Sequence, residues 1–194
     1  MAIYCTEAER REYEETGYWR SLPNLIPSVV FHRRGLNPVG NYEWLQSSTF
    51  DLFARKRNLI FSLPGAFTPT CSTYQLPDFE QLAPEFYTEG IDHIFCVTMN
   101  DAFVCNAWAD KNDLSEVIVL PDGSGKFTEG MQMVVDKDNV GFGRRSWRYA
   151  AVVDNGKITD WFIEEGKEDN HPDDPYLYTA PTLFSVNYER VNNS

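Results

Sequence analysis

The chain has 194 residues, 42% of them hydrophobic and 14% aromatic, which is enough to bury a sizeable core, and we expect one large domain. The formal net charge of −12 argues against nucleic acid or an anionic membrane as a partner, because both need clustered Lys and Arg. No apolar run approaches the ~20 residues of a membrane span, and residues 1–20 are acidic and polar rather than signal-like, so we expect a cytoplasmic protein.

The cysteines and histidines carry no metal pattern. The four cysteines are Cys5, Cys71, Cys96 and Cys105, and the three histidines are His32, His93 and His171. They form neither C-x-x-C nor H-E-x-x-H pairs and lack the density of a secreted disulfide scaffold, so a reducing compartment fits best. We therefore expect no metal and no cofactor, and we interpret His32 and His93 as surface or satisfied core residues.

The N-terminal part predicts an arm and then a strand. Residues 1–21 are highly charged and end near aromatic side chains, which favours an added arm or short helix before the core. A first strand is predicted over residues 29–33, bounded by Pro27 and by a turn region over residues 35–40.

A second, buried strand follows. Trp44 and residues 50–53 are expected to pack beneath it. Residues 58–63 form a nearly continuous apolar run, which is typical of a buried strand, and Pro64-Gly65 ends it.

The stretch after that strand, Ser62 to Ser72, reads SLPGAFTPTCS. Pro69 bars Thr68 from helical geometry, whereas Thr is a good N-cap and Pro is favoured at the first helical position. The helix is therefore predicted to begin at Pro69. Cys71 then lies in the first turn, where free N–H groups and the helix dipole favour a thiolate.

Strands and helices alternate beyond Cys71. The helix is expected to break at Pro77 and to resume with one apolar face as far as Gly90. The apolar positions of that face are Phe79, Leu82, Ala83 and Phe86. A strand over residues 94–98 and a helix over residues 101–110 follow.

The last third predicts a hairpin. A strand over residues 117–120, a short helix over residues 126–133 and a helix over residues 183–191 accompany two strands, 147–153 and 157–163, joined at Asn155-Gly156. Parallel strands need crossover helices, and a two-residue turn makes antiparallel neighbours. We therefore expect an α/β fold whose mixed sheet is covered by helices on both faces.

The motif Pro64-x-x-x-Thr68-x-x-Cys71, written PGAFTPTC here, resembles the active-site signature of peroxiredoxins, and its wording is similar to the peroxiredoxin-five subfamily of redoxin domains. The resemblance also extends through the stretches CVTMNDAFV from Cys96, LPDG from Leu120, GFGRRSWRY from Gly141 and VDNG from Val153, and covers roughly residues 27–171. It implies a thioredoxin-like fold and a homodimer. On that basis residues 27–194 are assigned to a redoxin domain and residues 1–26 to an N-terminal extension.

The resemblance implies reduction of hydrogen peroxide and organic (alkyl) hydroperoxides at Cys71, with Pro64, Thr68 and Arg148 completing the site. The chemistry suits these residue types. A thiolate attacks one peroxide oxygen while charge builds on the other, which requires fixed donors such as a hydroxyl and a forked guanidinium. Pro64, which has no N–H, is interpreted as a wall that keeps water from the sulfenic acid.

Several residues have structural alternatives. Arg144 and Arg145 lie close enough in sequence to compete with Arg148, which we prefer by motif match. Cys96 is interpreted as a small buried hydrophobe in a strand. Residues 122–125 are interpreted as a turn, because a phosphate loop needs a fuller pattern.

The second half of the cycle needs a thiol to condense with the sulfenic acid. No cysteine follows Cys105, and His171 stands where some similar sequences carry one. The leading interpretation is a one-cysteine enzyme recycled by glutathione and glutaredoxin, with thioredoxin as the other reductant. Whether Cys5 or Cys105 resolves Cys71 stays open at this point.

Two other functions fit the same residues. The chain could be a sensor that passes oxidation of Cys71 to a bound partner, or a non-enzymatic interaction protein with the same fold. A sensor would react rapidly with peroxide, but no reductant would support its turnover. A non-enzymatic interaction protein would have a Cys71 thiol with the ~8.5 pKa of free cysteine and negligible reactivity with peroxide.

Overall fold

The computed structural model describes residues 22–182. The arm predicted over residues 1–21 and the helix predicted over residues 183–191 lie outside the described residues. Within the described part, no helix is long and apolar enough to cross a membrane.

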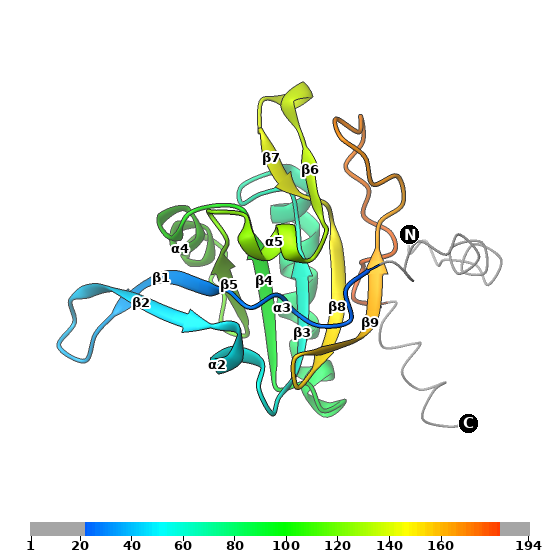
Figure 1. Cartoon of the computed structure of the whole chain (residues 1–194). Coiled ribbons are helices and arrows are strands. Elements are labelled where there is room, and N and C mark those ends of the chain that lie inside the picture. The colour runs from blue at the N-terminus through cyan, green and yellow to red at the C-terminus, as the bar shows by residue number, and fades with distance from the viewer. Residues whose placement is uncertain (1–21, 183–194) are drawn as a thin grey trace, which may run out of the picture.

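A mixed sheet of five strands forms the centre of the molecule, in the order β5-β4-β3-β8-β9 (Figure 1). The strands are β3 (Arg57–Ser62), β4 (His93–Thr98), β5 (Val117–Pro121), β8 (Tyr149–Asp154) and β9 (Lys157–Ile163). The first three run parallel, whereas β8 lies antiparallel to β3 and β9 antiparallel to β8. The predicted mixed sheet is confirmed.

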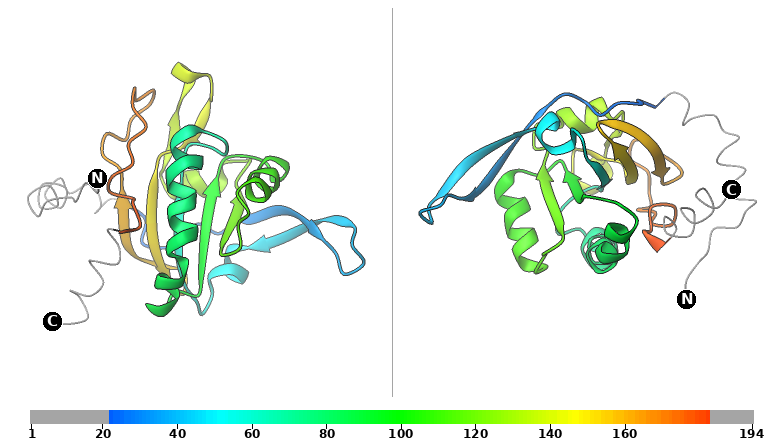
Figure 2. Two further views of the ribbon diagram at one scale, coloured as in Figure 1. Left: turned by 180° about the vertical axis from the view of Figure 1, so that it is seen from behind. Right: turned by 90° about the horizontal axis from the view of Figure 1, so that it is seen from below.

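Helices cover both faces of the sheet (Figure 2). They are α2 (Thr49–Phe53), α3 (Leu76–Thr88), α4 (Ala102–Lys111) and α5 (Lys126–Gly130). Successive strand residues point to opposite faces, so Leu59 and Phe61 join the core beneath α3 and α4, while Ile60 joins the core beneath α2 and α5. This arrangement is the expected thioredoxin-like fold.

The β8–β9 turn follows the sequence prediction. Asn155 and Gly156 have φ values of 48° and 80°, as a two-residue turn with both central residues in the left-handed region requires. Gly90, with φ of 84°, follows the end of α3 as predicted.

The region before β3 differs from the prediction. Strands β1 (Val30–Leu36) and β2 (Tyr42–Ser48) form an antiparallel hairpin that projects from the body of the molecule (Figure 1). Trp44 was expected beneath the next strand, but its side chain is 57% exposed and lies edge-on to Phe103 of α4, with ring centroids 5.8 Å apart. The prediction was wrong because β2 lies outside the central sheet and covers no part of the core.

The short helix α2 also departs from the expectation. Phe53 is buried as predicted, whereas Phe50 is largely exposed. Ser48 caps this helix in a reciprocal arrangement with Asp51. Phe50 and Phe53 are three positions apart, a spacing that places both toward one side of a helix, so the spacing alone does not explain why only Phe53 is buried.

The helix after Cys71 is not interrupted at Pro77. A π-helical segment, η2 (Cys71–Gln75), passes directly into α3, and Pro77 lies in the first turn of α3. The N–H of Leu76 donates to the carbonyl of Cys71, five residues back. A proline fits here because the wider turn has already changed the hydrogen-bond pattern that its missing N–H would break.

Two short strands were missed by the sequence analysis. Strands β6 (Val134–Asp136) and β7 (Arg144–Ser146) form a separate antiparallel ribbon, linked through the 3₁₀ turn η3 (Asp138–Val140). Helix α5 ends at Gly130 rather than residue 133, because Gln132 has φ of 59° and the chain then enters β6.

Two further segments run beside β9. Residues 23–26 lie along it, with a hydrogen bond from the N–H of Ile158 to the carbonyl of Asn24 (2.9 Å) and another from the N–H of Ile26 to the carbonyl of Gly156 (3.1 Å). After β9 the chain continues without regular structure, and residues 169–179, which we call the strap, return alongside β6 and β9 (Figures 1 and 2). The domain boundary at residue 26 stays a prediction.

Candidate active site

The helix that carries Cys71 begins at Pro69, as predicted. Cys71 is the first residue of η2 and its side chain is fully buried. Thr68 lies one turn earlier, and its carbonyl accepts a hydrogen bond from the N–H of Ser72 (3.0 Å). The Thr68 hydroxyl donates to the carbonyl of Gly65 (2.8 Å). In this conformation the hydroxyl braces the loop before the helix instead of capping the helix.

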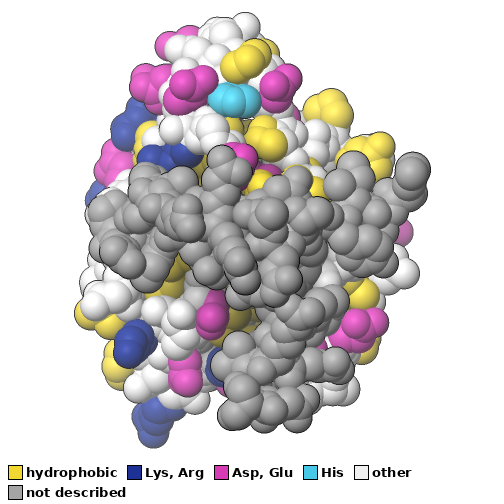
Figure 3. All heavy atoms as spheres, turned by 90° about the vertical axis from the view of Figure 1, so that its right-hand side faces the viewer, with side chains coloured by type: hydrophobic (Ala, Val, Ile, Leu, Met, Phe, Trp, Pro, Cys, Tyr) yellow, Lys and Arg dark blue, Asp and Glu magenta, His cyan; other side chains and the backbone are white. Residues whose placement is uncertain are grey.

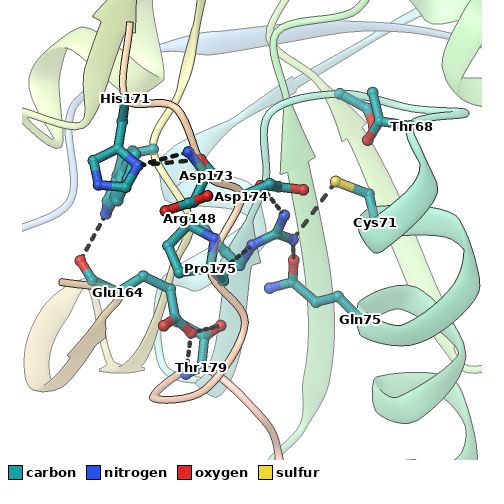
Figure 4. A network of polar contacts seen from close by, with 12 residues as sticks. Thr68, Cys71, Gln75, Arg148, Glu164, His171, Asp173, Asp174, Pro175 and Thr179 are labelled. Atoms are coloured by element: carbon teal, nitrogen blue, oxygen red, sulfur yellow. Dashed lines mark hydrogen bonds and ion pairs between the residues drawn. The ribbon is translucent and has the colours of Figure 1, made fainter. Parts of the chain in front are cut away.

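Arg148 is the cation that reaches Cys71 (Figure 4). It lies just before β8, it is 1% exposed, and its Nη1 donates to the sulfur of Cys71 at 3.5 Å. The same Nη1 donates to Oε1 of Gln75, which shares the buried side of η2 with Cys71. Residues 77 positions apart in sequence are thereby brought into one buried contact.

The other two nitrogens of Arg148 are held by the strap. Nη2 forms an ion pair with the carboxylate of Asp174, and Nε donates to the carbonyl of Pro175 (2.8 Å). Burial acts to lower the pKa of Arg148, but the charges of Cys71 and then Asp174 outweigh it and raise the pKa. The guanidinium therefore stays charged and is fixed in its plane by acceptors on several sides.

The competing arginines point elsewhere. Arg144 pairs with Glu129 at 2.6 Å in an exposed ion pair. Arg145 donates from Nη1 to the carbonyl of Met99 (3.1 Å). Of the three candidates, the structure brings Arg148 to the thiol.

The loop between β3 and the helix is held by Asn100. Its Oδ1 accepts from the N–H of Ala66 (2.9 Å) and from the hydroxyl of Thr98 (2.9 Å). Pro64 is buried at the start of this loop, directly after Leu63. Phe67 has φ of 64°, an uncommon value for a residue with a side chain, which shows how tightly the loop turns.

The remaining cysteines that the structure describes are buried in the core. Burial raises the pKa of Cys96 well above its ordinary value and, with the charge of Asp101, raises the pKa of Cys105 to about 12. Both thiols therefore stay protonated near neutral pH, which agrees with the structural interpretation of Cys96. Cys5 lies outside the described residues.

The histidines lie away from the thiol contacts. His32 is exposed, as expected for a surface residue. Burial, followed by the charge of Lys56, lowers the pKa of His93. His171 belongs to the strap, where its Nδ1 accepts from the N–H of Asp173 (3.1 Å) and its ring lies edge-on to Trp147.

The strap itself is the part of the site that the sequence analysis missed. The C-terminal part of the strap is fixed by Glu164. The Oε1 of Glu164 accepts from the N–H groups of Leu177 and Thr179, both at 2.8 Å, and from the Thr179 hydroxyl at 2.7 Å. The other end of the strap is fixed by Lys137, whose Nζ donates to the carbonyls of His171 and Asp173. No periodicity marks such a segment, so sequence patterns alone could not place Asp174 or Pro175 at the thiol.

The outer surface beside the strap is acidic. Asp and Glu side chains gather at the upper end of the face shown in Figure 3. Glu168, Asp169 and Asp173 are exposed in this region. The strap thus carries negative charge on its outside while it presents Asp174 inward to Arg148.

Within the described residues, no group of His, Cys, Asp or Glu side chains could hold a metal ion. A buried thiol at a helix start, held by a fixed arginine on a thioredoxin-like sheet, defines a thiol enzyme of the thioredoxin superfamily.

Residues 42–179 match the Redoxin family. The chain is 53% identical over 168 residues to the protein named "Peroxiredoxin" from Rhizobium etli, an alignment that covers 83% of this chain and 92% of the relative. The chain belongs to the peroxiredoxin family of thiol peroxidases.

Solved structures agree. The Plasmodium falciparum antioxidant protein, titled a 1-Cys peroxiredoxin, superposes with a TM-score of 0.79 at 34% identity, covering 89% of this chain and 100% of that one. Reduced Prx3 of Vibrio vulnificus in complex with hydrogen peroxide superposes with a TM-score of 0.75 at 30% identity, covering 90% of this chain and 99% of that one.

Proposed function

We propose that Cys71 is the thiol that attacks hydrogen peroxide and alkyl hydroperoxides. The thiolate sulfur bonds to one peroxide oxygen as the O–O bond breaks. Sulfur is oxidised to sulfenic acid, and the other oxygen leaves as hydroxide or alkoxide and is protonated to water or an alcohol. The observation that carries this proposal is the 3.5 Å contact between Nη1 of Arg148 and the Cys71 sulfur inside a buried site.

Arg148, Thr68 and Pro64 complete the proposed site. The Arg148 fork stabilises the thiolate and the charge that develops on the departing oxygen. The Thr68 hydroxyl donates to the carbonyl of Gly65 in this structure, and its proposed role is to turn and donate to a peroxide oxygen instead. Pro64 shields the sulfur from water, and its buried position supports that role.

The cycle is proposed to use one protein cysteine, recycled by glutathione and glutaredoxin. Glutathione condenses with the sulfenic acid, giving a mixed disulfide and water, and a second thiol then releases Cys71 and oxidised glutathione. The proposal is supported by the buried, protonated state of Cys96 and Cys105 and by the 1-Cys title of a structural neighbour. Thioredoxin is the alternative reductant.

The enzyme is further proposed to act as a cytoplasmic homodimer. Aromatic side chains exposed on the β1–β2 hairpin and on α4 offer a surface for self-association, with Trp44 and Phe103 57% and 61% exposed. Sedimentation of the wild type and of a Trp44→Ser variant tests the dimer, and a monomer in both would contradict it.

The Cys71→Ser variant tests the function. Thiol-dependent consumption of peroxide should disappear, whereas Cys105→Ser, as a matched control, should keep it. The same assay is run once with glutathione plus glutaredoxin and once with thioredoxin. Turnover in the thioredoxin assay but not in the glutathione and glutaredoxin assay would contradict the proposed reductant.

Disulfide mapping by mass spectrometry tests the one-cysteine cycle. After one equivalent of peroxide without added thiol, only Cys71 should carry sulfenic or sulfinic acid. A disulfide between Cys71 and Cys5 or Cys105 would instead show a resolving cysteine, and normal turnover in Cys71→Ser would exclude the assignment of Cys71.

A further inference from the structure

Two acidic groups share the guanidinium of Arg148. Nη1 faces the sulfur of Cys71 and Nη2 faces the carboxylate of Asp174 (Figure 4). The Arg148 side chain is 1% exposed, while that of Asp174 is 36% exposed. A single buried positive charge is therefore divided between the reacting group and a carboxylate at the surface of the strap.

We propose that Asp174 is a positioning residue that orients Arg148 and limits how strongly its charge stabilises the thiolate of Cys71. This inference rests on the proposed role of Cys71 and concerns only its reaction with peroxide, so it does not depend on which thiol regenerates the enzyme.

The strap gives Asp174 this role because it is built to hold one position. Lys137 is 5% exposed, and its ammonium donates to the carbonyl of Asp173, next in the chain to Asp174. On the other side of Asp174, the carbonyl of Pro175 accepts from Nε of Arg148. The Asp174 carboxylate is thus placed by backbone contacts on both sides, and a fixed ion pair needs little ordering when the thiolate forms.

Other charged or titratable groups near Arg148 are already engaged. The Tyr176 ring lies 5.8 Å from the guanidinium carbon, and its hydroxyl donates to Asp78 of α3 (2.7 Å). Burial, followed by the Asp78 contact, raises the pKa of Tyr176, so this phenol stays neutral. Glu164, the residue directly after β9, has its Oε1 turned to the strap's own N–H groups. Among the described residues, Asp174 is the carboxylate that directly contacts the guanidinium.

Removing the Asp174 charge should make the Cys71 thiolate easier to form but slower to attack peroxide. Without the carboxylate, the full charge of Arg148 acts on the sulfur, and the thiolate forms at lower pH. The guanidinium also loses one of its fixed partners, and a more stabilised thiolate is a weaker nucleophile, so attack on peroxide slows. A merely structural strap would behave differently, since a loosened Arg148 would stabilise the thiolate less and move its formation to higher pH.

The Asp174→Asn variant tests this inference. The rate of Cys71 alkylation by iodoacetamide is followed against pH by mass spectrometry of the Cys71 peptide. We expect the midpoint of that profile to fall by about one pH unit, and the peroxide rate constant above the midpoint to fall about tenfold. A midpoint that is unchanged or higher would overturn the inference.

Two controls isolate the contact from the general acidity of the strap. Asp173→Asn removes the same charge one residue earlier, from an exposed side chain, and should leave the midpoint in place. Asp174→Glu keeps the charge and should stay within a few tenths of a pH unit of the wild type. An equal fall of the midpoint in Asp173→Asn would attribute the effect to surface charge and overturn the role of Asp174.

The two measurements also separate this inference from the proposed function. Alkylation reads the state of the Cys71 thiol without peroxide or reductant. If wild-type Cys71 is alkylated normally but fails to consume peroxide, the proposed function is wrong. If peroxide is consumed and the midpoint does not fall in Asp174→Asn, only the role of Asp174 is wrong.

Discussion

Arg148 contributes geometry as well as charge, because its nitrogens face acceptors on two segments of the chain, η2 and the strap. The acceptors are the sulfur and amide oxygen of η2, the carboxylate of Asp174 and the carbonyl of Pro175. A point charge on a flexible stem could satisfy at most part of this arrangement. The forked geometry of the guanidinium is therefore the property that a substitution at Arg148 should test.

Arg148→Lys keeps the charge but loses the fork. We expect the rate constant for peroxide reduction to fall about 100-fold, because a lysine cannot hold the thiolate and the strap at the same time. Stopped-flow measurement of peroxide consumption under single-turnover conditions gives the rate constant. Arg144→Lys, in an exposed ion pair, is the matched control and should react like the wild type. Equal rates in the two variants would contradict the role given to the Arg148 fork.

At this scale the sequence predicts residues that obey local rules. Cys71 was placed at a helix start by Pro69 and Thr68, and the helix begins there. Gln75 and Asp174 were not predicted as site residues, because each belongs to the site only through a contact with Arg148, and no local sequence pattern indicates that contact. Arg148 itself was chosen over Arg144 and Arg145 by resemblance rather than by chemistry.

At the scale of elements, helix α3 also supports the edge of the sheet. The carboxylate of Glu80 accepts from the N–H groups of Ser115, Glu116 and Val117, at the start of β5. Burial acts to raise the pKa of Glu80, but these hydrogen bonds outweigh it and lower the pKa. One side chain thus joins a helix to a strand 37 positions away.

Glu80→Gln should destabilise the protein in a pH-dependent way. The amide places an NH₂ group against one of the strand's N–H donors, which we expect to cost about 1–2 kcal/mol of unfolding free energy at neutral pH. The pKa of Glu80 is lower in the folded state, so its contribution is complete above the unfolded value of about 4.3 and is lost as the pH falls through the folded value. The difference from wild type should therefore shrink below about pH 4.

Urea unfolding at neutral and at acidic pH measures this difference. Glu85→Gln removes an exposed carboxylate from the same helix and should change stability little at either pH. A Glu80→Gln effect that stays constant down to the acid range would contradict the stabilising role of the ionised form.

The central elements were predictable because each carries its own signal. The apolar runs of β3, β4 and β5 and the Asn155-Gly156 turn all agree with their final conformation. Strand β1 was predicted in part, over residues 29–33. Strands β2, β6 and β7 escaped prediction because they lie in small ribbons outside the central sheet, where burial imposes no clear alternation. The continuous helix through Pro77 escaped because a π-helical turn has no sequence signature.

At the scale of the whole molecule, the strap connects three distant regions. It contacts the β6–β7 ribbon through Lys137, the end of β9 through Glu164 and the thiol site through Arg148. Its path was not predictable, since residues 169–179 have no regular structure and are held by side chains from elsewhere. The stability of the site therefore depends on contacts well outside it.

Lys137→Met should loosen the strap without unfolding the sheet. Methionine fills a similar volume but cannot donate to the carbonyls of His171 and Asp173. We expect amide hydrogen exchange within residues 169–179 to accelerate about tenfold and the peroxide rate constant to fall, with a loss of at most a few degrees in melting temperature.

Hydrogen exchange followed by mass spectrometry resolves the strap from the sheet. Lys126→Met, at an exposed position at the start of α5, serves as the control and should leave exchange in the strap unchanged. A Lys137→Met variant whose strap exchanges at the wild-type rate would show that the buried ammonium does not hold it.

The order of the chain gives the strap a consequence during protein synthesis. Cys71 and the helix that carries it leave the ribosome long before Asp174 and Pro175, which complete the surroundings of Arg148. A nascent chain that has emerged as far as β8 thus contains Cys71 and Arg148 but lacks the contacts of Asp174 and Pro175 that fix the guanidinium. Full peroxidase reactivity should then arise late in translation, so that a partly made chain exposes an oxidisable cysteine before it can use it efficiently.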